Sequence, residues 1–181
     1  QRAHVDHRLR LTGTDDDAVA VFRRETNSVS VDFGKLTFLQ VLKDGAAGGT
    51  FLDGAAGIDL SPDGAFAYVA AGGTDDAISV FSRNTTILDA LNFGKLTYQS
   101  ERHEGELSGL GGAASGLDDA RQALVSPDGQ HLYVASKLSD AVVVFQRNPA
   151  TGSLKYLGVH RDESVSACVQ PTSCIIHSLD G

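Results

Sequence analysis

The chain contains short apolar runs in which both faces of an extended strand would be hydrophobic. In the first run, Val19 and Val21 would point one way and Ala18, Ala20 and Phe22 the other. The run occurs three times, as "DAVAVF" (17–22), "DAISVF" (76–81) and "DAVVVF" (140–145). A strand needs this pattern when other sheets cover both of its faces. We therefore expect these segments to be inner strands of stacked sheets.

Each apolar run is followed by a segment that alternates between apolar and polar residues. Leu36 and Phe38 alternate with Lys35 and Thr37, which is typical of an outer strand with one wet face. This segment recurs as "GKLTF" (34–38), "GKLTY" (94–98) and "GSLKY" (152–156). A turn, "SPDG", begins at Ser61 and Ser126 and is degraded to "SLDG" at Ser178. The chain therefore consists of repeats.

The repeat is long enough for four short strands. Phe22, Phe81 and Phe145 lie 59 and 64 positions apart. Strands A and B would flank the Ser-Pro-Asp-Gly turn, in which Pro presets φ and Gly closes the turn. The apolar run is strand C and the alternating segment is strand D. Four-stranded sheets stacked around an axis predict an all-β fold, a β-propeller of antiparallel blades. A β-sandwich with accidental self-similarity is the alternative.

The repeated pattern "SPDGxxLYVAS", "DAVxVFxR" and "GxLxY" resembles the YVTN-type repeat of lactonase-like seven-bladed propellers. This resemblance covers nearly the whole chain and implies a scaffold, and scaffolds host many functions. No catalytic residue of that family can be placed on this sequence by motif. The repeats predict a blade with strands B, C and D at 8–43, full blades at 54–101 and 119–161, and strand A with its turn of a next blade at 173–181.

About three blades' worth of sequence cannot close a ring, because propellers typically have four to eight blades. We expect the partner to be the remaining blades of a longer chain. The alternative is a second copy, which would give six blades. In both cases the open ends of this partial ring would expose sheet surface that needs a partner.

Charge and cysteine content narrow the partners and the compartment. A net charge of −8 argues against nucleic acid, and no apolar run is long enough to insert into a membrane. Cys168 and Cys174 flank the short loop "CVQPTSC" and can close a small disulfide ring, which persists outside a reducing cytosol. We therefore expect an extracellular, periplasmic or cell-surface protein. Two reduced thiols are the alternative.

Antiparallel strand order places the B–C and D–A loops at one end of the blades. Most of the Asp and Glu residues of the loops fall there, so this end should be strongly acidic. The opposite end should hold Arg23, Arg24, Arg83 and Arg147. Clustered carboxylates could bind Ca²⁺, although no cofactor is required; the first candidates are Asp15, Asp16, Asp75 and Asp76. The alternative is that Asp is there as a turn residue.

The loop "RHEGELSGLGGAASGLDDAR" (102–121) contains the largest number of side chains that could act in catalysis. Hydrolysis of a lactone needs a base to activate water and a group that polarises the carbonyl. His, carboxylate and Arg side chains could supply both, and we expect them to lie within reach of one another; the candidates are His103, Glu104, Asp118, Asp119 and Arg121. A solvated loop without catalytic function is the alternative.

Two functions remain open from the sequence. The near-identical repeats and the lack of a defined catalytic constellation favour a non-catalytic extracellular or surface module, which binds a protein or a small molecule at its acidic end. The alternative is a hydrolase that resembles the lactonase-like propellers, as a 6-phosphogluconolactonase relative. A phosphorylated substrate would require a cluster of Lys and Arg, whereas the predicted binding end is acidic.

Overall fold

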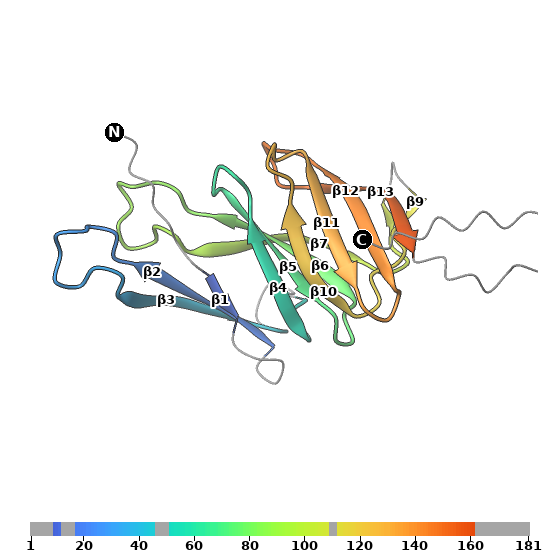
Figure 1. Ribbon diagram of the computed structural model, residues 1–181, viewed down its shortest axis with the longest axis horizontal. Helices are drawn as coiled ribbons and strands as arrows, with labels where there is room; N and C mark the ends of the chain where they lie inside the picture. Colours follow the sequence, from blue (N-terminus) through green and yellow to red (C-terminus); the bar gives the residue numbers. More distant parts are fainter. Residues whose placement is uncertain (1–8, 12–16, 46–50, 109–111, 162–181) are drawn as a thin grey trace, which may run out of the picture.

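The computed structural model describes residues 9–11, 17–45, 51–108 and 112–161. Within these residues the chain forms strands and connecting turns but no helix. Figure 1 shows three large sheets that follow one another along the long axis. The first blade is β1 (Leu9–Leu11), β2 (Ala18–Arg24) and β3 (Leu36–Lys43); the second is β4 (Ala55–Leu60), β5 (Phe66–Ala71), β6 (Ala77–Arg83) and β7 (Leu96–His103); the third is β10 (Ala120–Val125), β11 (His131–Ser136), β12 (Ala141–Arg147) and β13 (Leu154–Arg161). A small ribbon of β8 (Leu107–Ser108) and β9 (Gly112–Ala113) lies in the connection between the second and third blades.

Within each large sheet, neighbouring strands in sequence pair antiparallel. This order creates two ends. We call the end with the β3–β4, β5–β6, β7–β10 and β11–β12 connections the loop end. The end with the Ser-Pro-Asp-Gly turns and the β6–β7 and β12–β13 connections is the turn end.

The two Ser-Pro-Asp-Gly turns are closed by the same hydrogen bonds. Ser61 Oγ accepts from the N–H of Phe66 at 3.0 Å, and Asp63 Oδ1 accepts from the N–H of Ala65 at 3.0 Å. In the third blade, Ser126 Oγ accepts from His131 at 3.0 Å and Asp128 Oδ1 from Gln130 at 3.0 Å. Side chains of this kind satisfy turn N–H groups that no strand partner reaches. The sequence repeat is therefore a repeat of local structure.

The repeated Phe of the apolar run packs on the repeated aromatic residue of the next strand. The register between these two strands shifts beside the Phe in all three blades. The rings meet edge to face, with centroids 5.8, 5.9 and 5.9 Å apart, in the pairs Phe22–Phe38, Phe81–Tyr98 and Phe145–Tyr156. Such a pair contributes about 0.5–1.5 kcal/mol beyond area burial. Two sequence motifs thus form one packing unit in each blade.

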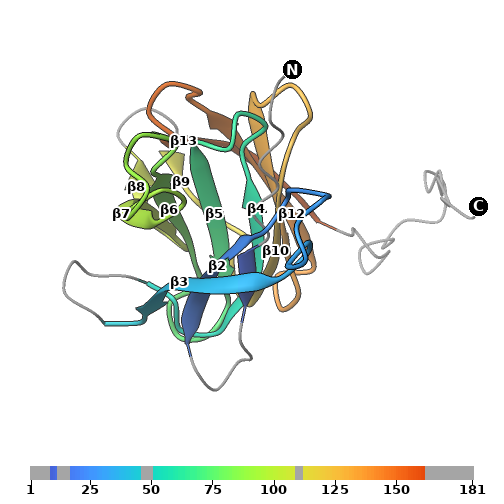
Figure 2. The same cartoon turned by 90° about the vertical axis from the view of Figure 1, so that its left-hand side faces the viewer.

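The second blade is covered on both faces, as its apolar strands predict. Tyr68, Ile78 and Val80 belong to a core shared with Leu132 and Phe145 of the third blade. On the other face, a second core contains buried residues of the first and second blades: Val19, Val21, Ala67, Val69, Phe81 and Leu96. Figure 2, viewed from the side of β2 and β3, shows β4 and β5 of the second blade behind them, with β10 and β12 of the third blade farther back. The predicted all-β class and the stacked, partial propeller are confirmed.

The innermost strands of the second and third blades approach closely at a glycine. A Cβ atom on Gly57 in β4 would lie 2.5 Å from the carbonyl oxygen of Arg121 and 2.8 Å from the Cα of Gln122 in β10. Only a residue without a side chain allows this backbone separation. Gly57 therefore sets the spacing of the two blades near their inner edge.

Several predictions from the sequence fall on parts of the chain outside the described residues. These are the Cys168–Cys174 disulfide, the next blade's first strand at 173–181, and the metal candidates Asp15 and Asp16. Among the described residues, no helix is long and apolar enough to cross a bilayer.

Candidate active site

The aspartate that opens each apolar run has a structural role at the loop end. Asp17, Asp76 and Asp140 all have left-handed φ angles, of 43°, 42° and 45°. Asp17 Oδ1 accepts from the N–H of Gly54 at 2.9 Å, and Asp76 Oδ1 accepts from the N–H of Asp119 at 2.8 Å. Gly54 and Asp119 immediately precede the first strand of the following blade. The carboxylates of Asp17 and Asp76 therefore join neighbouring blades.

The two proposed calcium ligands that the structure describes, Asp75 and Asp76, already accept backbone hydrogen bonds. Asp76 bonds the next blade, and Asp75 Oδ2 accepts from the N–H of Asp53 at 3.0 Å. Among the described residues no group of three or more His, Cys, Asp or Glu side chains could hold a metal ion. Calcium binding thus stays a prediction from the sequence, without support from this geometry.

His103, at the end of β7, lies between two carboxyl-bearing residues. Its Nδ1 lies 3.4 Å from the carbonyl oxygen of Asp75, and its Nε2 lies 3.5 Å from Glu101 Oε1. A carbonyl oxygen can only accept, so the contact at Nδ1 favours the tautomer with the proton there. In the neutral ring, Nε2 then has its lone pair free to accept a proton. The Glu101 carboxylate beside it would stabilise the cation that forms.

An aromatic contact orients the imidazole. The Phe51 ring meets it edge to face, with centroids 4.5 Å apart. The hydroxyl of Ser79, a buried residue of β6, donates to the Phe51 carbonyl at 2.7 Å. About 28% of the His103 side chain stays exposed. The ring is therefore held in place but can be reached by a small molecule.

The carboxyl groups of Asp75 and of its neighbour Asp53 have pKa values shifted in opposite directions. Burial raises the pKa of Asp75, and the negative charges of Asp44 and Asp53 raise it further. The hydrogen bond from the N–H of Asp53 and the charge of His103 act in the opposite direction and lower it. Hydrogen bonds from the side chain and backbone of Thr74 lower the pKa of Asp53. Carboxyl pairs whose environments separate their pKa values are typical of acid and base catalysts. We define His103, Asp75, Asp53, Glu101 and Phe51 as the His103 site.

The five candidate residues from the 102–121 loop do not form one cluster, contrary to the expectation. Asp119 receives a bidentate ion pair from Arg121, with Nε–Oδ1 and Nη2–Oδ2 distances of 2.7 and 3.0 Å. Glu104 Oε2 accepts from the N–H of Leu117 at 2.6 Å, so it closes its own loop. Asp118 is exposed, and its carbonyl oxygen accepts from Ser139 at 3.3 Å. Among the described residues, no hydrogen bond or ion pair of His103 reaches Asp118, Asp119 or Arg121.

Sequence reasoning found His103 and Asp75 separately but missed their neighbours. The sequence indicates Asp75 only as a possible metal ligand, and it gives no sign that Asp53 and Glu101 belong to a site. Asp53 and Asp75 are 22 residues apart in the chain, and Asp75 and His103 are 28 apart. Three connections of the loop end bring them together. The raised pKa of Asp75 depends on this packing, and no motif in the sequence indicates it.

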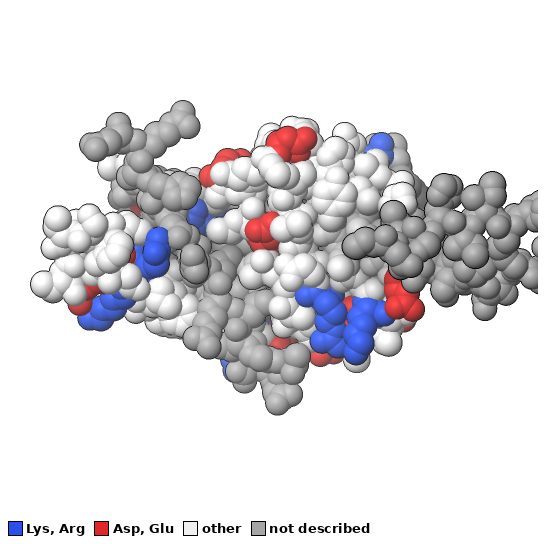
Figure 3. Space-filling model, viewed as in Figure 1, with Lys and Arg blue, Asp and Glu red and all other residues white. Residues whose placement is uncertain are grey.

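The loop end carries both signs of charge, whereas the sequence predicts a strongly acidic end. Arg121 and Lys137 are exposed there, as are Asp118 and Asp140. Figure 3 shows blue and red side chains together at the lower end of the third blade. Around His103 itself the carboxylates dominate. The basic residues gather at the neighbouring blade junction.

A hollow of about 570 Å³ opens at the turn end of the third blade, and none of its lining residues belongs to the His103 site. Its lining contains the cations Arg102 and Lys155 and the buried Arg147, but no carboxyl group; the other lining residues are Gln130, Gln146, Asn148, Pro149, Ser153 and Leu154. Arg102 faces this side because its Nε donates to the Leu154 carbonyl at 3.0 Å. Without an acid–base pair, the hollow is a poorer candidate for hydrolysis than the His103 site.

Comparisons with known proteins place the fold among lactonases. Residues 11–171 match the family described as "Lactonase, 7-bladed beta-propeller". A 6-phosphogluconolactonase of Formosa agariphila is 31% identical over 103 residues, which are 56% of this chain and 24% of that protein. The periplasmic gluconolactonase of Pseudomonas aeruginosa superimposes with a TM-score of 0.59 at 25% identity, over 86% of this chain and 39% of that one. A protein from Lactobacillus plantarum gives a TM-score of 0.62 at 24% identity, over 86% and 38% of the two chains.

These relatives correct the functional prediction. The main expectation, a non-catalytic surface module, is wrong, because the named relatives are lactonases and the family is a lactonase family. Near-identical repeats indicate a scaffold, but they say nothing against a catalytic site built from the loops between them. The alternative, a lactonase-like hydrolase, is the better supported. This chain spans roughly a quarter to two-fifths of the length of the relatives it matches. It belongs to the lactonase family of seven-bladed β-propellers.

Proposed function

We propose that the chain supplies the acid–base site of a lactone hydrolase. The observation that carries this proposal is the His103 site, where an imidazole lies between Asp75 and Glu101 with its Nε2 unprotonated in the neutral ring. Nucleophilic attack by water on a lactone needs a general base of this kind. The family membership makes hydrolysis of a lactone the reaction to consider first.

The proposed reaction uses three groups of this site. His103 Nε2 takes a proton from a water molecule, whose oxygen forms a bond to the lactone carbonyl carbon. Glu101 stabilises the imidazolium. The bond between that carbon and the ring oxygen then breaks, and protonated Asp75, whose pKa is raised by burial, gives its proton to the leaving ring oxygen. The product is a hydroxy acid, and the enzyme regains its starting state when the proton on His103 passes to Asp75, either directly or through solvent water.

The charge of the His103 site favours a neutral sugar lactone. Glu101 lies beside the imidazole and Asp53 lies beside Asp75, and the carboxylates of Glu101 and Asp53 would repel a phosphate dianion. A relative in the same family is named as a gluconolactonase, and another as a 6-phosphogluconolactonase. We therefore propose an unphosphorylated aldonolactone as substrate.

The test is hydrolysis of glucono-1,5-lactone and of its 6-phosphate ester, followed by acid release at constant pH. We expect enzyme-dependent hydrolysis of the neutral lactone, with a kcat/KM at least tenfold above that of the phosphate ester. A preference for the phosphate ester would contradict the substrate assignment. Rates that do not rise with the chain's concentration for either lactone would contradict the proposed activity.

We also propose a location outside the cytosol. Cys168 and Cys174 are spaced for a small disulfide ring, and one structural relative is a periplasmic enzyme. Titration of thiols in the denatured, unreduced protein tests this. The proposal requires fewer than one thiol per chain, whereas two thiols would contradict it.

A further inference from the structure

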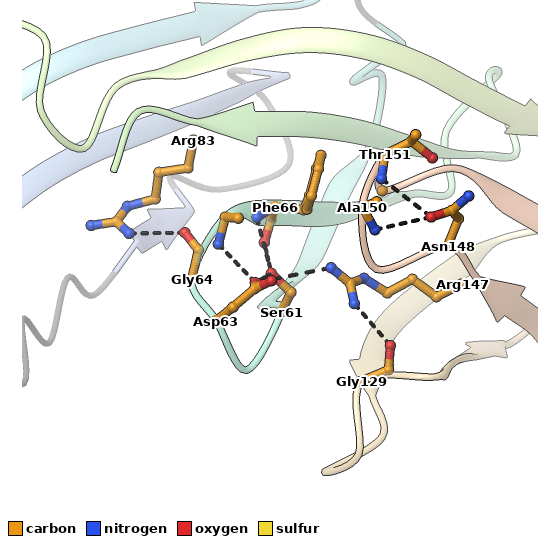
Figure 4. A network of polar contacts seen from close by, with 12 residues as sticks. Ser61, Asp63, Gly64, Phe66, Arg83, Gly129, Arg147, Asn148, Ala150 and Thr151 are labelled. Carbon is orange, nitrogen blue, oxygen red and sulfur yellow. Dashed lines mark hydrogen bonds and ion pairs between the residues drawn. The ribbon is translucent and has the colours of Figure 1, made fainter. Parts of the chain in front are cut away.

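A buried arginine ties the third blade to the second at the turn end. Arg147, the last residue of β12, donates from Nη1 to the carbonyl of Gly129 in its own blade at 2.8 Å. Its Nε donates to the Tyr68 hydroxyl of the second blade at 2.6 Å, and that hydroxyl donates to the Gly152 carbonyl at 3.0 Å. Nη2 lies 4.0 Å from Asp63 Oδ1. Figure 4 shows Arg147 pointing across to the turn that holds Ser61 and Asp63.

The corresponding arginine of the second blade lacks this connection. Arg83 donates from Nη1 to the Gly64 carbonyl at 2.9 Å, as Arg147 does to Gly129. In the first blade, however, Leu9 pairs with Val21 at the position where Tyr68 pairs with Val80. Among the described residues, Nε and Nη2 of Arg83 have no hydrogen-bond partner. The contact between blades therefore depends on the tyrosine and is not a general result of blade packing.

The third blade repeats the tyrosine on its open face. Tyr133 pairs with Val144 as Tyr68 pairs with Val80. Around it, Ala135, Val142 and Val144 occupy the positions of Ala70, Ile78 and Val80. The residues of the second blade are at most 1% exposed beneath the third blade, whereas Tyr133 is 39% and Val142 is 42% exposed. The covered face of one blade is thus reproduced, almost residue for residue, on the uncovered face of the next.

In the seven-bladed family fold a further blade covers this open face, which is formed by Tyr133, Ala135, Val142 and Val144. We propose that an arginine of that blade donates to the Tyr133 hydroxyl. The arginine would lie two residues after the Phe of strand C, where Arg24, Arg83 and Arg147 lie in this chain. Its own-blade bond to the glycine of the Ser-Pro-Asp-Gly turn would fix its direction, as for Arg147. The Tyr133 hydroxyl of the third blade and this arginine of the following blade would therefore fix how the two blades face each other. This proposal is independent of the proposed catalytic function.

The proposed contact can be tested by adding a second copy of the third blade after the first. Arg161 pairs with Ala141 as His103 pairs with Ala77. Residues 104–161 can therefore follow Arg161 in the way that they follow His103. The extended chain, residues 1–161 followed by a second copy of 104–161, is compared with the 181-residue chain. In the extended chain, the duplicated Arg147 should reach Tyr133.

The measurement is urea unfolding of both chains with and without Tyr133→Phe. In the extended chain we expect Tyr133→Phe to raise the unfolding equilibrium constant about fivefold or more, because the arginine loses its acceptor in a buried position. In the 181-residue chain we expect a change below about twofold. Tyr68→Phe, whose hydroxyl already binds Arg147, serves as the matched control and should have the same effect in both chains. Equal effects of Tyr133→Phe in the two chains would overturn the proposal.

Amide hydrogen exchange gives a second measure. Docking should slow exchange in β11 and β12 of the original third blade by roughly tenfold or more. Unchanged exchange, including the case in which the added blade fails to fold, would overturn the proposal. A concentration-dependent dimer of the 181-residue chain that is lost in Val142→Asp but kept in Leu138→Asp, an exposed residue outside this face, would overturn it as well. It would show that a second copy is the occupant.

Discussion

Asp76 Oδ1 accepts a hydrogen bond from the backbone N–H of Asp119 at 2.8 Å, and this bond joins the second blade to the third. The same bond joins the first blade to the second, where Asp17 accepts from Gly54 at 2.9 Å. Both acceptors have left-handed backbones, which Asp and Asn tolerate better than other side chains. One residue type thus satisfies a backbone requirement and a contact between blades.

Replacing Asp76 by Ala should destabilise the chain by about 1–3 kcal/mol, because the N–H of Asp119 loses its partner and Ala is strained at a φ of 42°. Asp76→Asn keeps an oxygen acceptor and tolerates this backbone, so we expect a loss below about 0.5 kcal/mol. Urea unfolding measures both. Similar losses in the two variants would show that the charge, not the hydrogen bond and the backbone, is what matters.

Gly57→Ala should destabilise the chain by about 1–3 kcal/mol, because the new Cβ would lie 2.5 Å from the backbone oxygen of Arg121. Gly158→Ala in β13 is the matched control, since a Cβ there meets nothing within 4 Å. We expect that variant to be neutral or slightly more stable. Thermal unfolding compares them. A Gly57→Ala midpoint equal to that of Gly158→Ala would contradict the close approach of β4 and β10.

Asp75 should make the stability fall as the pH rises through its pKa. The folded pKa is raised above the ordinary 3.8, so between these two values the folded chain binds more protons than the unfolded chain. The contribution of Asp75 is therefore present at low pH and lost above the raised pKa. Asp53, with its lowered pKa, acts in the opposite direction and only at lower pH. The difference in unfolding free energy between the wild type and Asp75→Asn, measured from pH 3 to pH 8, should decrease with pH; a constant difference would contradict the raised pKa.

The sequence predicted the strands and their stacking well because these depend on local patterns. "DAISVF" is apolar on both faces, and β6 is buried on both faces. The site was predicted only in part. His103 and Asp75 carry recognisable chemistry, and they meet because His103 pairs with Ala77, two residues after Asp75. Phe51 and Asp53 come from the long connection before β4, which no local pattern in the sequence places there. Asp119 and Arg121 look equally reactive in the sequence, yet they neutralise each other at the next junction.

The contact between blades at the turn end was also missed. Arg147 is an ordinary charged residue in the sequence, although it is 2% exposed in the fold. Its role depends on Tyr68, which is 79 residues away. Comparison of corresponding positions in the repeats could have found it, since Tyr occurs at 68 and 133 but Leu at 9.

The most direct test of the proposed lactonase site is the kcat for glucono-1,5-lactone of His103→Gln beside that of His131→Gln. His131 lies in the third blade and belongs to no contact of the His103 site. Glutamine is close to histidine in size but cannot act as a base at neutral pH. We predict that kcat falls at least about a hundredfold in His103→Gln and stays within about twofold of wild type in His131→Gln. Equal rates in the two variants would contradict the assignment of His103 as the base.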